Sequence, residues 1–167
     1  MKIGIISDTH DQYENILKAV KILNQEQTAL VIHCGDWVSP FTQLFYKELQ
    51  CPIKGIFGNN DGDKKYHLIY AKKSKIEFLG ESSELEIEGK KLFVYHGTDN
   101  KITQKAINSG RYDAVLHGHT HVCVNKLIKK TLSLNPGTLI PVTDKKIQGA
   151  SVAIYETENN TAKFIRL

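Results

Sequence analysis

Short apolar runs alternate with amphipathic stretches through the first third of the chain. Three runs are almost continuously apolar and predict strands buried on both faces, at Ile3–Ile6, Ala29–Ile32 and Ile53–Phe57. Between the first two runs, Tyr13–Leu23 carries its apolar residues on one helical stripe. Between the second and third, Pro40 opens a helix that we expect to reach about Leu49. This order predicts a parallel sheet with helices on its faces.

The remainder of the chain is richer in strand patterns. Short helices are predicted at Asp63–Ala71 and at Ile102–Ser109, the second ended by Gly110. Glu88-Gly89-Lys90 predicts the turn of a hairpin. Strands are predicted at Lys75–Leu79, Glu84–Ile87, Leu92–Tyr95, Ala114–Leu116, Val122–Ile128, Thr131–Leu134, Gly149–Tyr155 and Ala162–Leu167. Two facing sheets with helices outside accommodate these elements, and the absence of a linker pattern predicts one domain over residues 1–167.

Composition excludes several classes of protein. The 167 residues are 41% hydrophobic and 24% charged, as in an ordinary globular domain, and the formal net charge of +4 fits either simple solubility or an anionic substrate. Three cysteines without a CxxC spacing argue against a disulfide framework and a cysteine-rich zinc site. The apolar run at the start is too short for a signal peptide or a membrane span, which predicts a cytoplasmic protein without a membrane partner.

Polar residues that carry chemistry follow five of the predicted strands. Each strand leads within a few residues to Asp, Asn or His, usually beside a glycine, in Asp8-Thr9-His10, Gly35-Asp36, Gly58-Asn59-Asn60-Asp61, His96-Gly97 and Gly118-His119-Thr120-His121. Ligands of open α/β sheets bind at the carboxyl ends of strands, where these five segments can converge. Any one of them alone is more often structural, but five coincident strand ends indicate a common site.

The residue types indicate a metal site. Imidazole and carboxylate together suit Zn²⁺, Mn²⁺, Fe²⁺, Ni²⁺ or Co²⁺. The candidate ligands are more numerous than one tetrahedral ion needs and fit two ions that share a carboxylate: Asp8, His10, Asp36, Asn59, His96, His119 and His121. Two divalent cations with two carboxylates leave a positive site, which attracts a phosphate ester.

In these motifs and their order, the sequence resembles the calcineurin-like metallophosphoesterase superfamily, and within it the small prokaryotic phosphodiesterases without a cap domain. The family pattern is D-x-H, G-D, G-N-x-D, a lone His and G-H-x-H, and the turn at Asn135-Pro136-Gly137 also matches the small group. The resemblance implies an α/β fold, a four-layer αββα sandwich of two mixed sheets. It also implies two divalent metal ions, Mn²⁺ foremost, and hydrolysis of small phosphodiesters by a metal-bound hydroxide.

The resemblance further implies how the ligands are divided. One ion is expected to be held by Asp8, His10, Asp36 and His121, and the other by Asp36, Asn59, His96 and His119, with Asp36 bridging. The residues expected to act in catalysis are Asp36, Asn59, Asn60, Asp61 and His96.

Two positions depart from the family pattern. Many relatives have a titratable His at the position of Asn60, which helps to protonate the leaving group, and an amide cannot do so. We therefore expect slow turnover and a preference for good leaving groups. Thr98 stands where the small group often has a further His. Outside the motifs, His33 and Cys34 are expected to be buried near the site, and His67 to be solvated on a surface helix.

Three other functions remain open from the sequence. A protein-binding scaffold on the same fold, like the retromer subunit, is the main alternative, although such a scaffold is expected to have lost ligands. A nuclease is disfavoured, because the chain has no cap domain and no basic, aromatic-interleaved groove, so nucleic acid is not the expected partner. A phosphomonoesterase stays open, since the metals alone do not select a diester. A homo-oligomer is a further expectation.

Overall fold

The apolar runs at the start of the chain become neighbouring parallel strands. In the computed structural model, which describes residues 1–141 and 149–167, one mixed sheet (sheet A) has the strand order β11-β10-β1-β2-β3-β4. β1 to β4 are parallel, and the β10–β11 hairpin adds antiparallel to β1. The strands are β1 (Lys2–Ile6), β2 (Leu30–His33), β3 (Ile53–Gly55), β4 (Ile76–Phe78), β10 (Ser151–Glu156) and β11 (Thr161–Arg166).

A second mixed sheet (sheet B) has the order β5-β6-β7-β9-β8. β6, β7 and β9 are parallel, while β5 and β8 are antiparallel to their neighbours. The β5–β6 turn falls on Glu88 and Gly89, both at positive φ, as the sequence predicts. The strands are β5 (Ser82–Ile87), β6 (Lys90–Tyr95), β7 (Ala114–Leu116), β8 (Val124–Ile128) and β9 (Thr131–Asn135).

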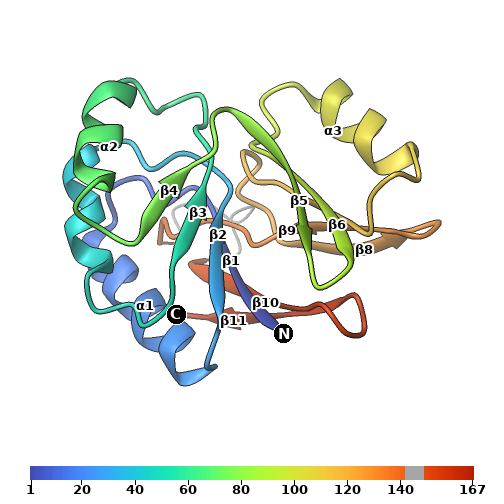
Figure 1. Cartoon of the computed structure of the whole chain (residues 1–167), viewed down its shortest axis with the longest axis horizontal. Coiled ribbons are helices and arrows are strands. Elements are labelled where there is room, and N and C mark those ends of the chain that lie inside the picture. Colours follow the sequence, from blue (N-terminus) through green and yellow to red (C-terminus); the bar gives the residue numbers. More distant parts are fainter. Residues whose placement is uncertain (142–148) are drawn as a thin grey trace.

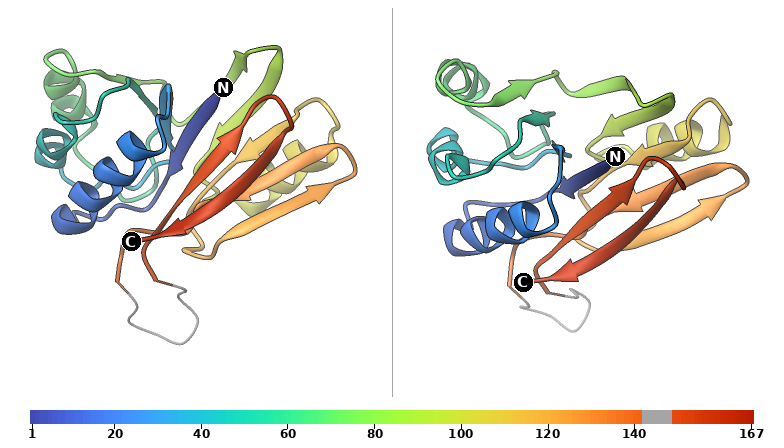
Figure 2. Two further views of the ribbon diagram at one scale, coloured as in Figure 1. Left: turned by 90° about the horizontal axis from the view of Figure 1, so that it is seen from below. Right: turned by 60° about the horizontal axis from the view of Figure 1, so that its bottom comes forward.

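Helices cover the outer faces of both sheets (Figure 1). Sheet A carries α1 (Tyr13–Gln25), the 3₁₀ helix η1 (Pro40–Tyr46) and α2 (Lys64–Ala71), and sheet B carries α3 (Asn100–Asn108). The views from other sides show the same layers, with the two sheets between the helices (Figure 2). Two mixed sheets with helices outside confirm the expected fold class.

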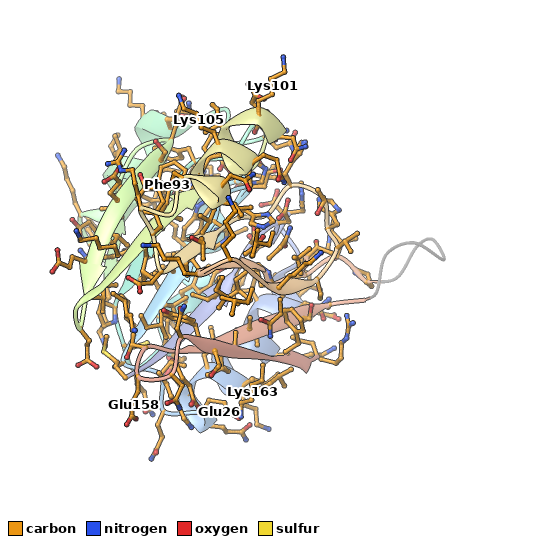
Figure 3. All side chains as sticks on the ribbon, turned by 90° about the vertical axis from the view of Figure 1, so that its right-hand side faces the viewer. Glu26, Phe93, Lys101, Lys105, Glu158 and Lys163 are labelled. Carbon is orange, nitrogen blue, oxygen red and sulfur yellow. The ribbon has the colours of Figure 1, made fainter. Side chains whose placement is uncertain are left out.

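Alternate residues of the central strands enter different cores. Val31 packs toward α1 and η1, whereas its neighbours Leu30 and Ile32 pack between the two sheets. A strand buried on both faces needs apolar residues at every position, which explains the continuous apolar runs. A third, smaller core lies under α3, where Phe93 packs against its buried face (Figure 3).

Two local predictions were wrong. The helix expected from Pro40 to about Leu49 is a 3₁₀ helix that ends at Tyr46. His67 is not solvated but fully buried, because α2 packs on η1 and its ring meets Gln43. Gln43 Nε2 lies 3.1 Å from His67 Nδ1 and donates to the His67 carbonyl oxygen at 3.0 Å. A polar partner at this position is not visible in the hydrophobic pattern of α2.

Among the described residues, no helix is both long and apolar enough to span a bilayer.

Candidate metal centre

The predicted ligands approach one another where strands of both sheets end. Asp8 and Asp36 follow the parallel strands β1 and β2 of sheet A. His96 directly follows β6, and His119 and His121 follow β7, in sheet B. Parallel strands present their carboxyl ends at one edge, and the packing of the two sheets brings both edges together.

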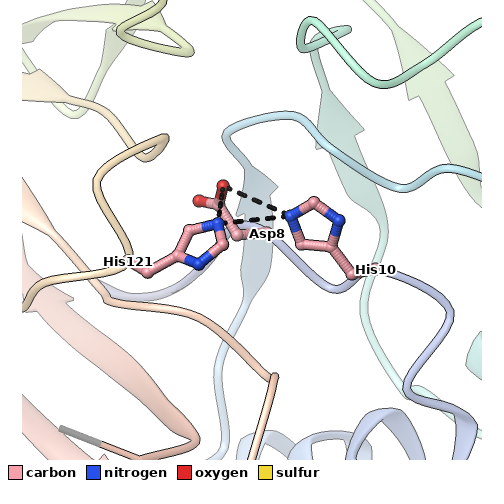
Figure 4. A group of neighbouring side chains, drawn as sticks. All are labelled: Asp8, His10 and His121. Carbon is pink, nitrogen blue, oxygen red and sulfur yellow. Dashed lines mark hydrogen bonds and ion pairs between the residues drawn. The ribbon is translucent and has the colours of Figure 1, made fainter. Parts of the chain in front are cut away.

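The first group of possible metal donors consists of Asp8, His10 and His121 (Figure 4). Asp8 Oδ1 lies 3.2 Å from His121 Nε2 and 3.8 Å from His10 Nε2. The two imidazole Nε2 atoms lie 3.3 Å apart. One carboxylate oxygen and two ring nitrogens thus face a common point, an arrangement that suits a divalent cation.

The second group consists of Asp8, Asp36 and His96. His96 Nε2 lies 3.3 Å from Asp36 Oδ2 and 3.9 Å from Asp8 Oδ1. The other ring nitrogen, Nδ1, lies 2.8 Å from the carbonyl oxygen of Cys34, which can only accept a hydrogen bond. Nδ1 therefore carries a proton, and in the neutral ring the lone pair of Nε2 faces the carboxylates.

The position of His96 suits a metal ligand. Its side chain is 1% exposed, and its Nε2 makes no hydrogen bond of regular geometry among the described residues, the nearest acceptor being Asp36 Oδ2 at 3.3 Å. Buried polar atoms without a partner are rare in proteins, so this nitrogen calls for an explanation. A divalent cation bound beside the two carboxylates would satisfy it.

The electrostatics of the cluster favour ionised carboxylates. Burial acts to raise the pKa of both Asp8 and Asp36, since a carboxylate loses hydration inside the protein. The neighbouring imidazoles of His10 and His121 overcome this effect and hold the pKa of Asp8 far below its ordinary value. His96 and Asn60 likewise lower the pKa of Asp36 to about 2. Two buried negative charges need cationic partners, whether protons on the imidazoles or metal ions.

Two of the seven expected ligands lie outside both groups. Asn59 is exposed, and its Oδ1 accepts a hydrogen bond from Thr98 Oγ1 at 3.2 Å. His119 is also exposed, and its ring lies edge-on to His96 at 5.3 Å between centroids. Its backbone N–H donates to both oxygens of Asp8, at 3.2 and 3.0 Å. Both side chains are therefore at the rim of the cluster.

Asn60 and Asp61 contact the Asp36 loop in different ways. Asn60 donates from Nδ2 to Asp36 Oδ2 at 2.7 Å and from its backbone N–H to Oδ1 at 2.9 Å. Asp61 is buried and accepts the backbone N–H groups of Asp36, Gly58 and Val38, at 3.0, 2.6 and 2.8 Å. Asp61 thus fixes the loop that presents Asp36 and makes no described contact with the donor atoms of the cluster.

Three residues outside the donor groups support the ligands, and one of them, His33, is buried near the site as the sequence analysis expects. The ring of His33 is buried and stacks on Trp37. Its Nδ1 accepts a hydrogen bond from the Gly35 N–H at 3.1 Å, so the ring proton is on Nε2. Nε2 therefore donates to Thr9 Oγ1 at 3.2 Å. Thr138 Oγ1 donates to the Asp8 carbonyl oxygen at 2.7 Å. Asn135 Nδ2 donates to the Gly118 carbonyl oxygen at 2.8 Å. His33, before Cys34-Gly35-Asp36, and Asn135, in its Asn-Pro-Gly turn, carried a sequence signal, whereas Thr138 carried none.

Residues 1–160 match the calcineurin-like phosphoesterase superfamily domain, and the chain belongs to this superfamily. A relative from Methanocaldococcus jannaschii, named phosphodiesterase MJ0936, is 41% identical over 138 residues, which cover 82% of this chain and 83% of the relative.

Solved structures agree with this assignment. The chain superposes on a solved archaeal phosphodiesterase with a TM-score of 0.91 and 36% identity, over the full length of both chains. It also superposes on Yfce, a phosphoesterase from E. coli, with a TM-score of 0.73, covering 99% of this chain and 98% of that one. At 16% identity the second likeness concerns the fold alone.

Proposed function

We propose that this chain is a metal-dependent phosphodiesterase that hydrolyses small phosphate esters at the cluster of Asp8, Asp36 and their histidines. The observation that carries the proposal is the buried Nε2 of His96, which makes no hydrogen bond of regular geometry among the described residues and faces the carboxylates of Asp36 at 3.3 Å and Asp8 at 3.9 Å. Such a nitrogen is suited to a divalent cation. The name of the relative from M. jannaschii supports a diester as the substrate.

The arrangement of donors favours two ions with Asp36 between them. Asp36 Oδ2 lies 3.5 Å from His10 Nε2 and 3.3 Å from His96 Nε2, so one oxygen adjoins both donor groups. We assign one ion to Asp8, His10, Asp36 and His121, and the other to Asp36, Asn59, His96 and His119. Asn59 and His119 are exposed side chains and can turn toward the second ion.

When bound, such ions act as Lewis acids toward phosphoryl oxygens and water, and Mn²⁺ is our first choice for this oxygen- and nitrogen-rich donor set. The protein contributes position and charge. The Cys34 carbonyl fixes the ring of His96, and Asp61 holds the loop that carries Asp36. Asn60 can hold Asp36 or a phosphoryl oxygen by hydrogen bonds, but its amide delivers no proton to a leaving group.

The test is hydrolysis of a chromogenic phosphodiester and its monoester counterpart by metal-stripped protein, with and without Mn²⁺. We expect the diester to be hydrolysed only with metal. His119→Ala should abolish this activity, because it removes a proposed ligand whose side chain is exposed. Gln104→Ala, at a position on α3 that is also exposed, should leave the rate unchanged.

Other outcomes select the alternatives. Faster hydrolysis of the monoester would make the protein a phosphomonoesterase. No turnover by folded protein with Mn²⁺, Ni²⁺, Co²⁺, Fe²⁺ or Zn²⁺ would overturn the proposal and favour a protein-binding scaffold. The expected homo-oligomer remains a prediction, which the mass of the protein in solution tests.

A further inference from the structure

An apolar crevice lies at the opposite end of sheet A from the metal centre. Its lining includes Ile53 and Ile76, the first residues of β3 and β4, which are paired in the sheet and almost fully buried. Leu44 of η1 and Tyr70 of α2 also line it. The crevice has a volume of about 520 Å³. This size and apolar character are those of sites for small molecules.

The charged side chains that line the crevice are all positive. Lys47, Lys73 and Lys75 contribute to the lining, and no acidic residue of the described chain does. Lys75 Nζ donates to the Leu49 carbonyl oxygen at 3.4 Å, and Lys47 meets Glu48 only at 3.9 Å on the exposed surface. Lys73 makes no side-chain hydrogen bond or ion pair within residues 1–141 and 149–167. The crevice therefore offers positive charge without a matching carboxylate.

A buried acceptor also belongs to this lining. Gln43 is 3% exposed, and its Nε2 is occupied by His67. Its Oε1 has no hydrogen-bond partner in the described part of the chain. An ionised carboxylate only accepts hydrogen bonds and cannot pair with this oxygen, so an anionic headgroup belongs beside the lysines and not beside Gln43.

We propose that the crevice binds a small anionic amphiphile, namely a molecule with an apolar chain or ring and a carboxylate headgroup. The apolar part packs on Leu44, Ile53, Tyr70 and Ile76, and the headgroup pairs with Lys73 and the neighbouring lysines. An apolar floor and a cationic rim are complementary to such a molecule. The proposal is independent of the phosphodiesterase reaction, because the crevice shares no residue with the metal centre.

The test is binding of dodecanoate to the intact protein, below its micellar concentration. Trp37, the single tryptophan of the chain, lies 5.7 Å from the ring of the lining residue Tyr46, so its fluorescence can report binding beside calorimetry. We expect saturable binding of one molecule. Leu44→Asp and Lys73→Glu should each weaken it about tenfold or more, since the first puts a negative charge against the apolar part of the ligand and the second reverses a charge of the rim.

The matched control variants carry substitutions in α3, the helix that covers sheet B (Figure 3). Ile102→Asp and Lys105→Glu make the same kinds of change at exposed positions and should not alter binding. Leu44 is itself 58% exposed, so its replacement leaves the cores intact. His119→Ala should also bind dodecanoate normally, because the carboxylate is not expected at the metal centre.

Four results would overturn the proposal. The first is that the wild-type protein does not bind dodecanoate saturably, and the second is that the α3 variants weaken binding as much as Leu44→Asp and Lys73→Glu do. The third is that His119→Ala loses binding while Leu44→Asp keeps it. The fourth is that the wild-type protein binds dodecanol as tightly as dodecanoate. The last result would show that the lysines do not recognise a charge.

Discussion

Asn60 is the residue at which this chain departs most clearly from its family pattern. Its side chain donates to Asp36 Oδ2 at 2.7 Å, so the amide supports the carboxylate that we place between the ions. An amide does not titrate near neutral pH, and a leaving alkoxide receives no proton from it. The reaction should therefore depend strongly on the acidity of the leaving group.

Replacement of Asn60 by His should restore a general acid. We expect Asn60→His to raise kcat by about ten- to a hundredfold for a phenyl diester, and to change it little for a p-nitrophenyl diester, which needs no acid. Asn60→Ala removes the contact with Asp36 without adding an acid and is the control. An equal gain on both substrates would argue against the explanation.

Thr98 is expected to position a metal ligand. Its Oγ1 donates to Asn59 Oδ1 at 3.2 Å, which leaves one lone pair of that oxygen for an ion. Thr98→Val should weaken binding of the second Mn²⁺ by about tenfold, as measured by calorimetry, because partners of ligands typically contribute this much. Thr98→Ser keeps the hydroxyl and should bind Mn²⁺ like the wild type. Equal affinities in both variants would exclude this role.

The loops after the strands hold the cluster in an unusual backbone conformation. Five of the seven proposed ligands have positive φ, namely Asp8 (52°), His10 (41°), Asp36 (60°), His119 (68°) and His121 (59°). This region is unfavourable for residues with a Cβ and is typical of functional sites. Motif glycines allow the loops to approach: a Cβ on Gly58 would collide with the Asp36 carboxylate, and one on Gly118 with Ser7 Oγ and Asp8 Oδ2.

Gly118→Ala tests this close approach. The new methyl group would push the loop of His119 and His121 away from Asp8, so we expect loss of Mn²⁺ binding and a decrease of about 2 kcal/mol in the free energy of unfolding. Gly62→Ala is the matched control, because a Cβ there meets no atom within 4 Å. Calorimetry and urea unfolding measure the two effects. Normal Mn²⁺ binding by Gly118→Ala would contradict the expectation.

At the scale of the whole molecule, the buried contact between α2 and η1 makes stability depend on pH. Burial lowers the pKa of His67, although the Val38 carbonyl and the charges of Asp61, Asp63 and Asp11 act in the opposite direction. The unfolded chain therefore binds a proton here at a higher pH than the folded chain does. The contribution of His67 to stability is complete above its unfolded pKa of about 6.5 and is lost as the pH falls toward the folded value.

The variant His67→Gln isolates this contribution. Between about pH 7.5 and about pH 5, the free energy of unfolding should fall more in the wild type than in His67→Gln, because glutamine takes up no proton. Urea unfolding at both pH values gives the comparison, and the other titrating groups are common to both proteins. Identical pH dependence would show that His67 does not titrate differently on folding.

The ends of the buried strands could be predicted from the sequence because a buried parallel strand needs apolar residues at each position. The residues that follow such strands lie at the same edge of the sheet, which is the edge at the carboxyl ends of the strands. Asp8, Asp36 and His96 could be placed together on that ground. The burial of His67 could not be foreseen, since it depends on Gln43, which lies 24 positions away in a 3₁₀ helix. The His33–Thr9 contact depends in the same way on a tertiary pairing.

His10 and His121 stand 111 positions apart, on loops that belong to different sheets. During synthesis the first strand leaves the ribosome long before its partner, by on the order of 10 s at ordinary translation rates. The donor set can therefore be completed only after β7 has emerged and the sheets have packed. An ion bound by this whole donor set would therefore come from the metal pool that the nearly complete chain meets, since the nascent chain lacks half of the donors.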